Sequence, residues 1–179
     1  MPKIIADARG RILASARCTL LQQGYTQLSL RAIARDCNIA VGTIYNYFNN
    51  KESLIASVML EDWLEARKTM EQACESAQTA ADGVAAVYTA LDGFAGIYRQ
   101  VWRQFLHAGG STDVVAGRHG LLRGQIEACL AALLQRFGHS KDAALCPILA
   151  ELILSLVQQT DLGEADLRRL TNRLFGAAE

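Results

Sequence analysis

The chain carries the run Ser29-Leu-Arg-Ala-Ile-Ala-Arg-Asp-Cys-Asn-Ile-Ala-Val-Gly-Thr-Ile-Tyr-Asn-Tyr-Phe-Asn-Asn-Lys51, which predicts two short helices joined by a tight turn. Ser29 can cap the first helix, and Asn38 tolerates the left-handed backbone conformation that such a turn requires. Apolar side chains at spacings of three and four predict a buried face on the second helix. Its other face is polar and aromatic and consists of Thr43, Tyr45, Asn46 and Tyr47.

Two helices joined by a short turn suit the major groove of DNA, because a helix with its side chains is about as wide as that groove. The polar face supplies hydrogen-bond donors and acceptors, and its aromatic rings can pack on sugar and phosphate. Gly42 would let the start of the second helix approach the DNA backbone closely. Lys51 begins the next helix, where its ammonium and the backbone N–H groups can meet a phosphate.

Charge is distributed unevenly along the chain, although the net charge is zero. Residues 1–51 carry seven Lys and Arg residues against two acidic ones, a net charge of +5, and the remainder carries −5. A basic head on an acidic body favours an anionic partner for the head alone. The alternative is a chance asymmetry of charge. The helical motif in the same segment argues against that alternative.

Residues 9–55 resemble the DNA-binding domain of the TetR family of bacterial transcriptional repressors. The resemblance is carried by Gly24-Tyr25, by Leu30-Arg-Ala-Ile-Ala34, and above all by Val41-Gly-Thr-Ile-Tyr-Asn-Tyr-Phe48 followed by Lys51-Glu-Ser-Leu54. It covers about a quarter of the chain. The remainder agrees with the family only in length, helical pattern and acidic balance.

The resemblance implies that Arg31 contacts bases in some members of the family and that Tyr47 and Lys51 meet mainly phosphates. Asn46 occupies a variable position from which an adenine edge can be read. Tyr45 has an alternative interpretation as a half-buried core residue, and Arg35 is interpreted as a solvated surface charge. The predicted DNA-binding residues are Ser29, Arg31, Val41, Gly42, Thr43, Tyr45, Asn46, Tyr47 and Lys51.

The sequence departs from the family pattern at two positions of the motif. Ala40 stands at the helix start where many members carry a Ser or Thr cap, which puts the cap geometry in question. Asn38 replaces the usual Gly of the turn, where a left-handed Asn is tolerable.

The whole chain has an all-helical composition, with only two prolines and many Ala, Leu, Gln, Glu and Arg residues. Apolar spacing predicts helices over about 4–23, from Ser29 to Cys37, 40–50, 51–74, 84–105, 121–137, 143–158 and 164–175, with a short helix over 112–119. The expected fold is all-α: a three-helix helix-turn-helix DNA-binding domain over residues 1–51 and a helical sensor and dimerisation domain over 52–179.

The helices at 121–137 and 143–158 are too apolar for one buried stripe each, because Ala131, Ala132, Ala150 and Leu154 extend their faces. A second buried face predicts a partner, and deep burial inside one monomer is the alternative. The resemblance implies a homodimer in which these two helices of each subunit form a four-helix bundle. Two recognition helices would then bind a near-palindromic operator.

The resemblance also implies a ligand pocket among the central helices and release of the operator when the ligand binds. Aromatic and apolar candidates favour a hydrophobic effector, although core packing explains most of them equally well. The predicted lining residues are Tyr88, Phe94, Tyr98, Trp102, Phe105, Gln125 and Cys129. The alternative is a constitutive or partner-controlled DNA-binding protein without a small-molecule pocket.

Other functional classes find little support in the sequence. No metalloprotease, phosphate-loop, nucleophile-elbow or dinucleotide motif occurs, so we expect no enzyme, no cofactor and no metal site. The five cysteines, Cys18, Cys37, Cys74, Cys129 and Cys146, are widely spaced and are expected to be small buried hydrophobes, with a thiol sensor as the alternative. No signal segment or membrane span is predicted, so we expect a cytoplasmic protein.

Overall fold

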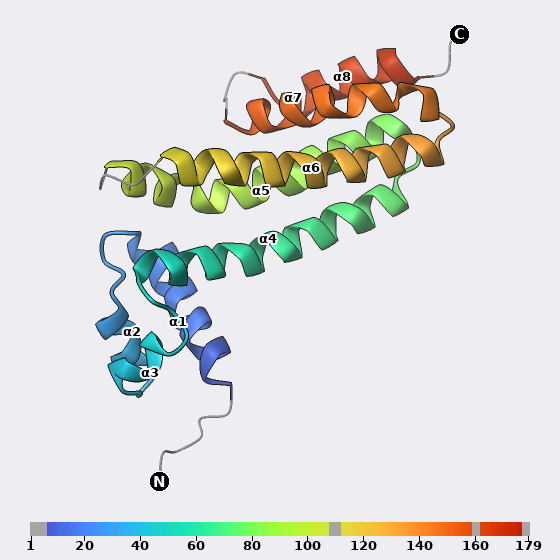
Figure 1. Ribbon diagram of the computed structural model, residues 1–179. Coiled ribbons are helices and arrows are strands. Elements are labelled where there is room, and N and C mark those ends of the chain that lie inside the picture. The colour runs from blue at the N-terminus through green and yellow to red at the C-terminus, as the bar shows by residue number, and fades with distance from the viewer. Residues whose placement is uncertain (1–6, 108–111, 159–161, 177–179) are drawn as a thin grey trace. The chain divides into compact units, whose positions relative to one another are not determined.

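The computed structural model describes residues 7–107, 112–158 and 162–176, and the regular structure within them is helical throughout (Figure 1). This confirms the predicted all-α fold. None of the described helices is long and apolar enough to cross a membrane. The elements are α1 (Ala8–Gln23), α2 (Leu30–Asp36), α3 (Val41–Tyr45), α4 (Lys51–Ser76), α5 (Ala80–His107), α6 (Thr112–Arg136), the 3₁₀ helix η1 (Ser140–Leu145), α7 (Cys146–Gln158) and α8 (Glu164–Phe175).

The chain packs as two compact units. The first contains α1, α2, α3, the part of α4 up to Leu64 and the part of α5 from Ile97 onward. The second contains the remaining parts of α4 and α5 together with α6, η1, α7 and α8. The predicted boundary between residues 51 and 52 refers to functional domains and stays a prediction.

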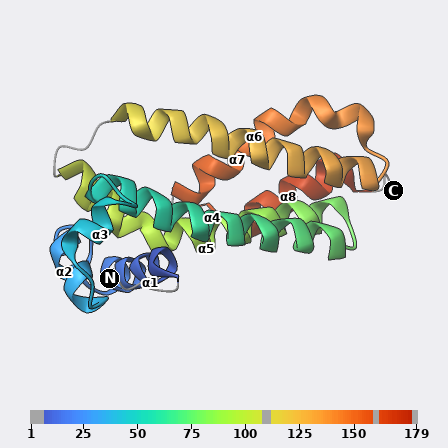
Figure 2. The same cartoon turned by 60° about the horizontal axis from the view of Figure 1, so that its bottom comes forward.

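The first unit has its core between α1, α2 and α3, which lie together in Figure 2. Its fully buried side chains include Ile12, Ile33 and Ile44, one from each helix. Helix α1 ends at Gln23 and is capped by Gly24, whose φ of 83° is open to glycine and strained for other residues. This ending turns the chain back, so that Leu28 is buried before α2 begins.

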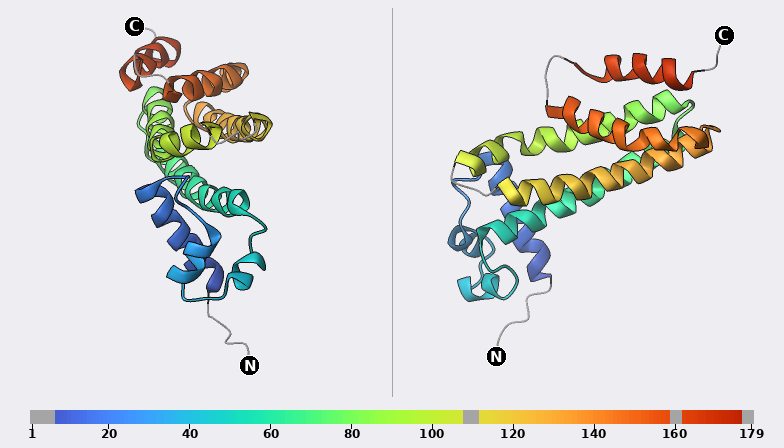
Figure 3. Two further views of the ribbon diagram at one scale, coloured as in Figure 1. Left: turned by 90° about the vertical axis from the view of Figure 1, so that its left-hand side faces the viewer. Right: turned by 45° about the horizontal axis from the view of Figure 1, so that its top comes forward.

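In the second unit α6 and α7 run antiparallel beside each other, as Figures 1 and 3 show. The buried residues Ile126 and Leu130 of α6 and Leu149 and Ile153 of α7 form this part of the core. Of the residues taken to extend the apolar faces, Ala150 and Leu154 are buried within the chain, whereas Ala132 is exposed.

Three predicted helix boundaries were wrong. Helix α3 ends at Tyr45 rather than near residue 50, because Asn50 turns out of it to cap α4. Residues 112–136 form one helix rather than a short helix followed by a second. Gly117 and Gly120 each cost about 1 kcal/mol of helix stability, which is too little to break a helix anchored by buried residues.

The third correction concerns the start of α7. An α-helix from residue 143 would need a hydrogen bond from the backbone nitrogen of Pro147 to the carbonyl of residue 143, and proline has no N–H. The chain instead forms the 3₁₀ helix η1, and α7 begins at Cys146 with Pro147 in its first turn.

The cysteines depart in part from the expected burial. Cys37, Cys74 and Cys146 are buried, but Cys18 is exposed and Cys129 is half-buried. The Sγ atoms of Cys74 and Cys129 lie 3.4 Å apart, although 55 residues separate these two cysteines in the sequence.

Candidate nucleic-acid interface

Helix α2 begins as the sequence predicts. The N–H of Ala32 donates a hydrogen bond to Ser29 Oγ at 3.2 Å, so that Ser29 is the N-cap. Leu30, Ile33 and Ala34 are buried below it. Arg31 is exposed on the opposite side and has no ion pair or side-chain hydrogen bond with the rest of the described chain. Its guanidinium is therefore available to an outside partner.

The turn between α2 and α3 is a Schellman motif built on Asn38. The φ of Asn38 is 52°, its N–H donates to the carbonyl of Arg35 at 3.0 Å, and the Ile39 N–H donates to the carbonyl of Ala34 at 3.0 Å. These hydrogen bonds fix the angle at which the chain leaves α2 and enters α3. The predicted left-handed Asn38 is confirmed.

Helix α3 and the turn that follows it, residues 41–48, divide their side chains as the apolar spacing predicts. Ile44 and Phe48 are buried, Val41 and Thr43 are half-buried, and Gly42 and Asn46 are exposed. Tyr45 is 53% exposed and Tyr47 47%, which rules out the alternative of Tyr45 as a half-buried core residue. Ala40 provides no side-chain cap, as its sequence implies. A Cβ added at Gly42 would meet nothing within 4 Å, so this side of α3 is open.

The start of α4 is tied down by reciprocal capping. The Ser53 N–H donates to Asn50 Oδ1 at 2.7 Å, and the Asn50 N–H donates to Ser53 Oγ at 3.2 Å. Lys51 Nζ lies 4.0 Å from the centroid of the Tyr25 ring, and burial lowers the pKa of this ammonium. The Tyr25 hydroxyl in turn donates to Glu52 at 3.0 Å. Lys51 is thus held at a defined place beside α3 by a cation–π contact.

The net charge counted over residues 1–51 overstates the free positive charge, because Arg9, Arg11 and Arg17 contact other groups of the first unit. Arg9 pairs with Glu61 at 3.0 Å and Arg17 with Asp62 at 2.9 Å. Glu61 and Asp62 lie outside residues 1–51, the range whose net charge is +5. Arg11 donates to the carbonyl of Cys37 at 2.7 Å and links α1 to α2. The positive charge left for an outside partner is smaller than the sequence indicates, and Arg31 and Lys51 are part of it.

Two interactions of the first unit lay outside the sequence reasoning. The backbone N–H of Tyr25 donates to Gln104 of α5 at 2.6 Å. The Tyr98 hydroxyl donates to Asp62 Oδ2 at 2.6 Å, on the carboxylate that also pairs with Arg17. Burial and the nearby Asp62 raise the pKa of Tyr98. Tyr25 and Gln104 are 79 residues apart in the sequence, and Tyr98 and Asp62 are 36 apart. No local sequence pattern therefore predicts these two hydrogen bonds.

The seven predicted ligand-lining residues are dispersed. Trp102 and Phe105 stack edge to face in the first unit, where Phe105 also meets Tyr25, and the fully buried Tyr98 lies in the same unit. In the second unit Phe94 lines one groove and Gln125 and Cys129 line another, while Tyr88 is half-buried. Their role in ligand binding stays a prediction.

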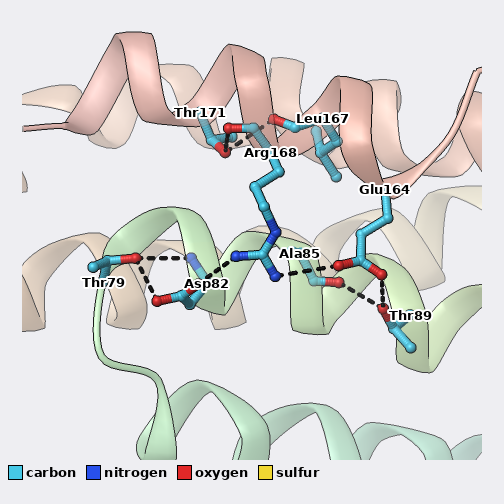
Figure 4. A network of polar contacts seen from close by, with 8 residues as sticks. All are labelled: Thr79, Asp82, Ala85, Thr89, Glu164, Leu167, Arg168 and Thr171. Atoms are coloured by element: carbon cyan, nitrogen blue, oxygen red, sulfur yellow. Dashed lines mark hydrogen bonds and ion pairs between the residues drawn. The ribbon is translucent and has the colours of Figure 1, made fainter.

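The larger groove of the second unit lies between α4, α5 and α8 and has a volume of about 520 Å³. Small side chains line most of it, and Asp82, Glu164 and Arg168 supply its polar edge. Figure 4 shows Arg168 of α8 between Asp82 of α5 and Glu164, with Thr89 donating to Glu164 at 3.2 Å. The Thr79 hydroxyl and Arg168 lower the pKa of Asp82.

Comparison with known proteins agrees with this interface. Residues 12–58 match the family of bacterial regulatory proteins described as the tetR family. The Escherichia coli K12 transcriptional regulator UidR is 41% identical over 54 residues, which are 30% of this chain and 28% of UidR. The chain thus matches little more than a quarter of the length of this curated relative.

Solved structures resemble the chain over nearly its full length. A putative transcriptional regulator from Rhodococcus sp. RHA1 has a TM-score of 0.63 at 17% identity and covers 96% of both chains. A second Rhodococcus RHA1 protein, a tetR-family regulatory protein, has a TM-score of 0.59 at 19% identity, over 98% of this chain and 100% of that one. At such identities the likeness shows the fold.

The fold and the exposed face of α3 define a helix-turn-helix protein with a C-terminal helical domain. Residues 12–58 are similar to the tetR family of bacterial regulatory proteins, and the chain has the fold of a solved tetR-family regulatory protein. Its relatives are transcriptional regulators rather than enzymes, in agreement with the class that the sequence predicts.

Proposed function

We propose that the protein is a DNA-binding transcriptional regulator that inserts α3 into the major groove. The observation that carries the proposal is the division of residues 41–48, with Ile44 buried and Tyr45, Asn46 and Tyr47 turned outward. Tyr45 and Tyr47 are about half exposed and add little to the core, whereas rings of this kind pack well on sugar and phosphate. The match of residues 12–58 to the family supports the same conclusion.

Each predicted contact residue has a role that suits its environment. Arg31, Thr43 and Asn46 present donors and acceptors to base edges. Gly42 permits close approach, and Lys51, held on the Tyr25 ring, neutralises a phosphate. Ser29 caps α2 with its side chain and presents its exposed surface beside Arg31. The remaining contacts are Val41, Tyr45 and Tyr47.

The regulator is proposed to act as a homodimer through α6 and α7. Leu121 is 70% exposed and Ile148 64% exposed, so each helix keeps an apolar side chain that its own chain does not cover. Gly124, which follows Leu121 on α6, is also exposed and adds a small residue to this face. Pairing of these faces would give a four-helix bundle and a palindromic operator.

Repression relieved by a small hydrophobic molecule completes the proposal. The groove of about 520 Å³ in the second unit is large enough for such a molecule. Helix α4 is continuous from Lys51 to Ser76 and contributes Ala66, Thr69 and Ala73 to that groove. A ligand that prefers the DNA-incompetent arrangement would shift the population away from the operator-bound state.

Footprinting of the region upstream of the protein's own gene tests the proposal, followed by affinity measurements on the protected segment at several salt concentrations. Tyr47→Ala and Lys51→Ala should each weaken operator binding by about tenfold or more while thermal stability stays near that of the wild type. Lys51→Ala should also reduce the salt slope by about one. Lys68→Ala, an exposed lysine of the same helix in the second unit, is the matched control.

Equal operator affinity in the two variants and the control would exclude α3 and the α4 start as the DNA-binding surface. A library of hydrophobic compounds then tests release from the operator. If no compound alters operator affinity, the protein is the constitutive or partner-controlled regulator that the sequence left as an alternative.

A further inference from the structure

The smaller groove of the second unit contains two cysteines whose sulfur atoms are in contact. Cys74 lies near the end of α4 and Cys129 in the middle of α6, and their Sγ atoms are 3.4 Å apart across 55 residues of sequence. A disulfide bond is about 2.05 Å long, so bond formation needs a further approach of about 1.4 Å. Among the described cysteines no other two sulfurs are in contact.

The two thiols have different environments. Cys74 is buried, and its contact with Cys129 and its burial raise the pKa of its thiol. Cys129 is half-buried, and its contact with the Cys74 thiol lowers the pKa of its own thiol. The charged groups around the pair are Arg136, which hydrogen-bonds the carbonyl of Cys74 at 2.6 Å, and Arg67, Glu71 and Glu75.

The pair is also accessible to a small reagent. Both cysteines line a groove of about 320 Å³, together with Gln125, Ala128 and Ala132 of α6. A peroxide is much smaller than this volume and can reach the sulfur of Cys129 without unfolding of the chain.

We propose that Cys74 and Cys129 form an oxidation site that a peroxide converts into an intramolecular disulfide between α4 and α6. The Cys129 thiolate attacks one oxygen of hydrogen peroxide, an S–O bond forms, the O–O bond breaks, and the departing hydroxide takes up a proton as water. Cys74 then attacks the sulfur of the sulfenic acid. An S–S bond forms, the S–O bond breaks, and the departing hydroxide leaves as water with the proton of the Cys74 thiol. Two thiols are oxidised and one peroxide is reduced to two waters.

The site is independent of the proposed function in DNA binding, because its readout is the chemistry of the two sulfurs. The reduced full-length protein is freed of reductant, treated with hydrogen peroxide near stoichiometry, quenched with catalase and alkylated. Intact mass spectrometry should show loss of two alkylatable thiols out of five. Non-reducing peptide mapping should join the peptides that contain Cys74 and Cys129, and a thiol reductant should restore both.

Variants assign the two roles. In Cys74→Ser the sulfenic acid cannot be resolved, so a dimedone-type probe should label Cys129, whereas Cys129→Ser should leave Cys74 unlabelled and alkylatable. Cys18→Ser, which removes an exposed thiol of α1, should form the same disulfide as the wild type. Full alkylation of Cys74 and Cys129 after Cys18 has been oxidised, or a disulfide that joins any other pair, would overturn the proposal.

Discussion

The polar interactions that shape the recognition segment, residues 29–53, and those that join the helices of the second unit span very different sequence distances. In the recognition segment the shaping hydrogen bonds join residues three to five positions apart, as between Ala32 and Ser29, Ile39 and Ala34, or Ser53 and Asn50. In the second unit Arg136 reaches back 62 residues to the carbonyl of Cys74, and Arg168 reaches back 86 residues to Asp82. The recognition segment is therefore shaped by local hydrogen bonds, whereas the second unit is joined by contacts between residues far apart in the sequence.

The similarity to known proteins divides in the same way. The helix-turn-helix is matched at 41% identity, whereas the full-length likeness to solved structures stands at 17–19%. A DNA-reading helix must keep an outward set of side chains in a given geometry. The helices of the second unit need buried apolar faces, a requirement that many sequences satisfy.

The strongest test of this division compares two fully buried isoleucines, Ile44 of α3 and Ile153 of α7. Replacement of either by alanine should cost about 2–5 kcal/mol, because a buried cavity forms. Hydrogen exchange should show that Ile44→Ala exposes amides of α2 and α3 and leaves α7 protected, with the reverse for Ile153→Ala.

Equal loss of protection in both units from either change would show that they unfold as one. Tyr45→Ala supplies the local control, since its side chain is 53% exposed and its loss should leave protection near that of the wild type.

The long-range contact of the first unit gives the next largest expected effect. Asp62→Asn removes the charge that holds Arg17 and the buried Tyr98 hydroxyl, and should cost about 1–3 kcal/mol in urea unfolding. The neighbouring Glu61→Gln affects only the exposed pair with Arg9 and should cost below about 0.5 kcal/mol. If the two changes cost the same, local hydrogen bonds alone hold the recognition segment.

A comparable effect of slightly smaller size is expected from Arg136. Its guanidinium donates to the carbonyls of Cys74 and Ala77, which close the end of α4. Arg136→Gln should reduce the free energy of unfolding by about 1–2 kcal/mol, because those carbonyls lose charge-assisted donors. Arg123→Gln, which disrupts a partly exposed pair with Glu127 one turn away on the same helix, should change the free energy less.

The smallest effect concerns pH. The Thr79 hydroxyl and Arg168 lower the pKa of Asp82 in the folded chain below its unfolded value of 3.8. The stabilisation is therefore complete above that unfolded value and is lost as the pH falls through the folded pKa. Because both side chains are about 40% exposed, the contribution should stay below about 1 kcal/mol.

Asp82→Asn should accordingly destabilise the protein near neutral pH and flatten the loss of stability below about pH 4, as followed by urea unfolding across pH. Asp36→Asn, at a surface carboxylate 3.7 Å from Arg35, is the control. If the free energy of unfolding of Asp82→Asn falls as steeply at low pH as that of the wild type, the Arg168 contact contributes nothing to stability.

The sequence predicted correctly those features that depend on residues within about one helical turn of each other. The Ser29 cap, the left-handed Asn38 and the inward Ile44 and Phe48 all follow from spacing and backbone preference. It was wrong about the start of α7, although Pro147 carried the signal, and about the length of α3, where the capping of α4 by Asn50 shortens the preceding helix. It treated Tyr98 as a ligand-lining residue without access to its partner Asp62.

By itself the sequence determined that the chain is helical, that a helix-turn-helix lies between Ser29 and Lys51, and which face of α3 turns outward, because helix periodicity and capping act over a few residues. The tertiary structure alone decided which charges of the basic head remain free, where Lys51 is held, and that the sulfurs of Cys74 and Cys129 meet. Those facts depend on helices far apart in sequence, and their pairing follows from packing of the cores rather than from any local pattern.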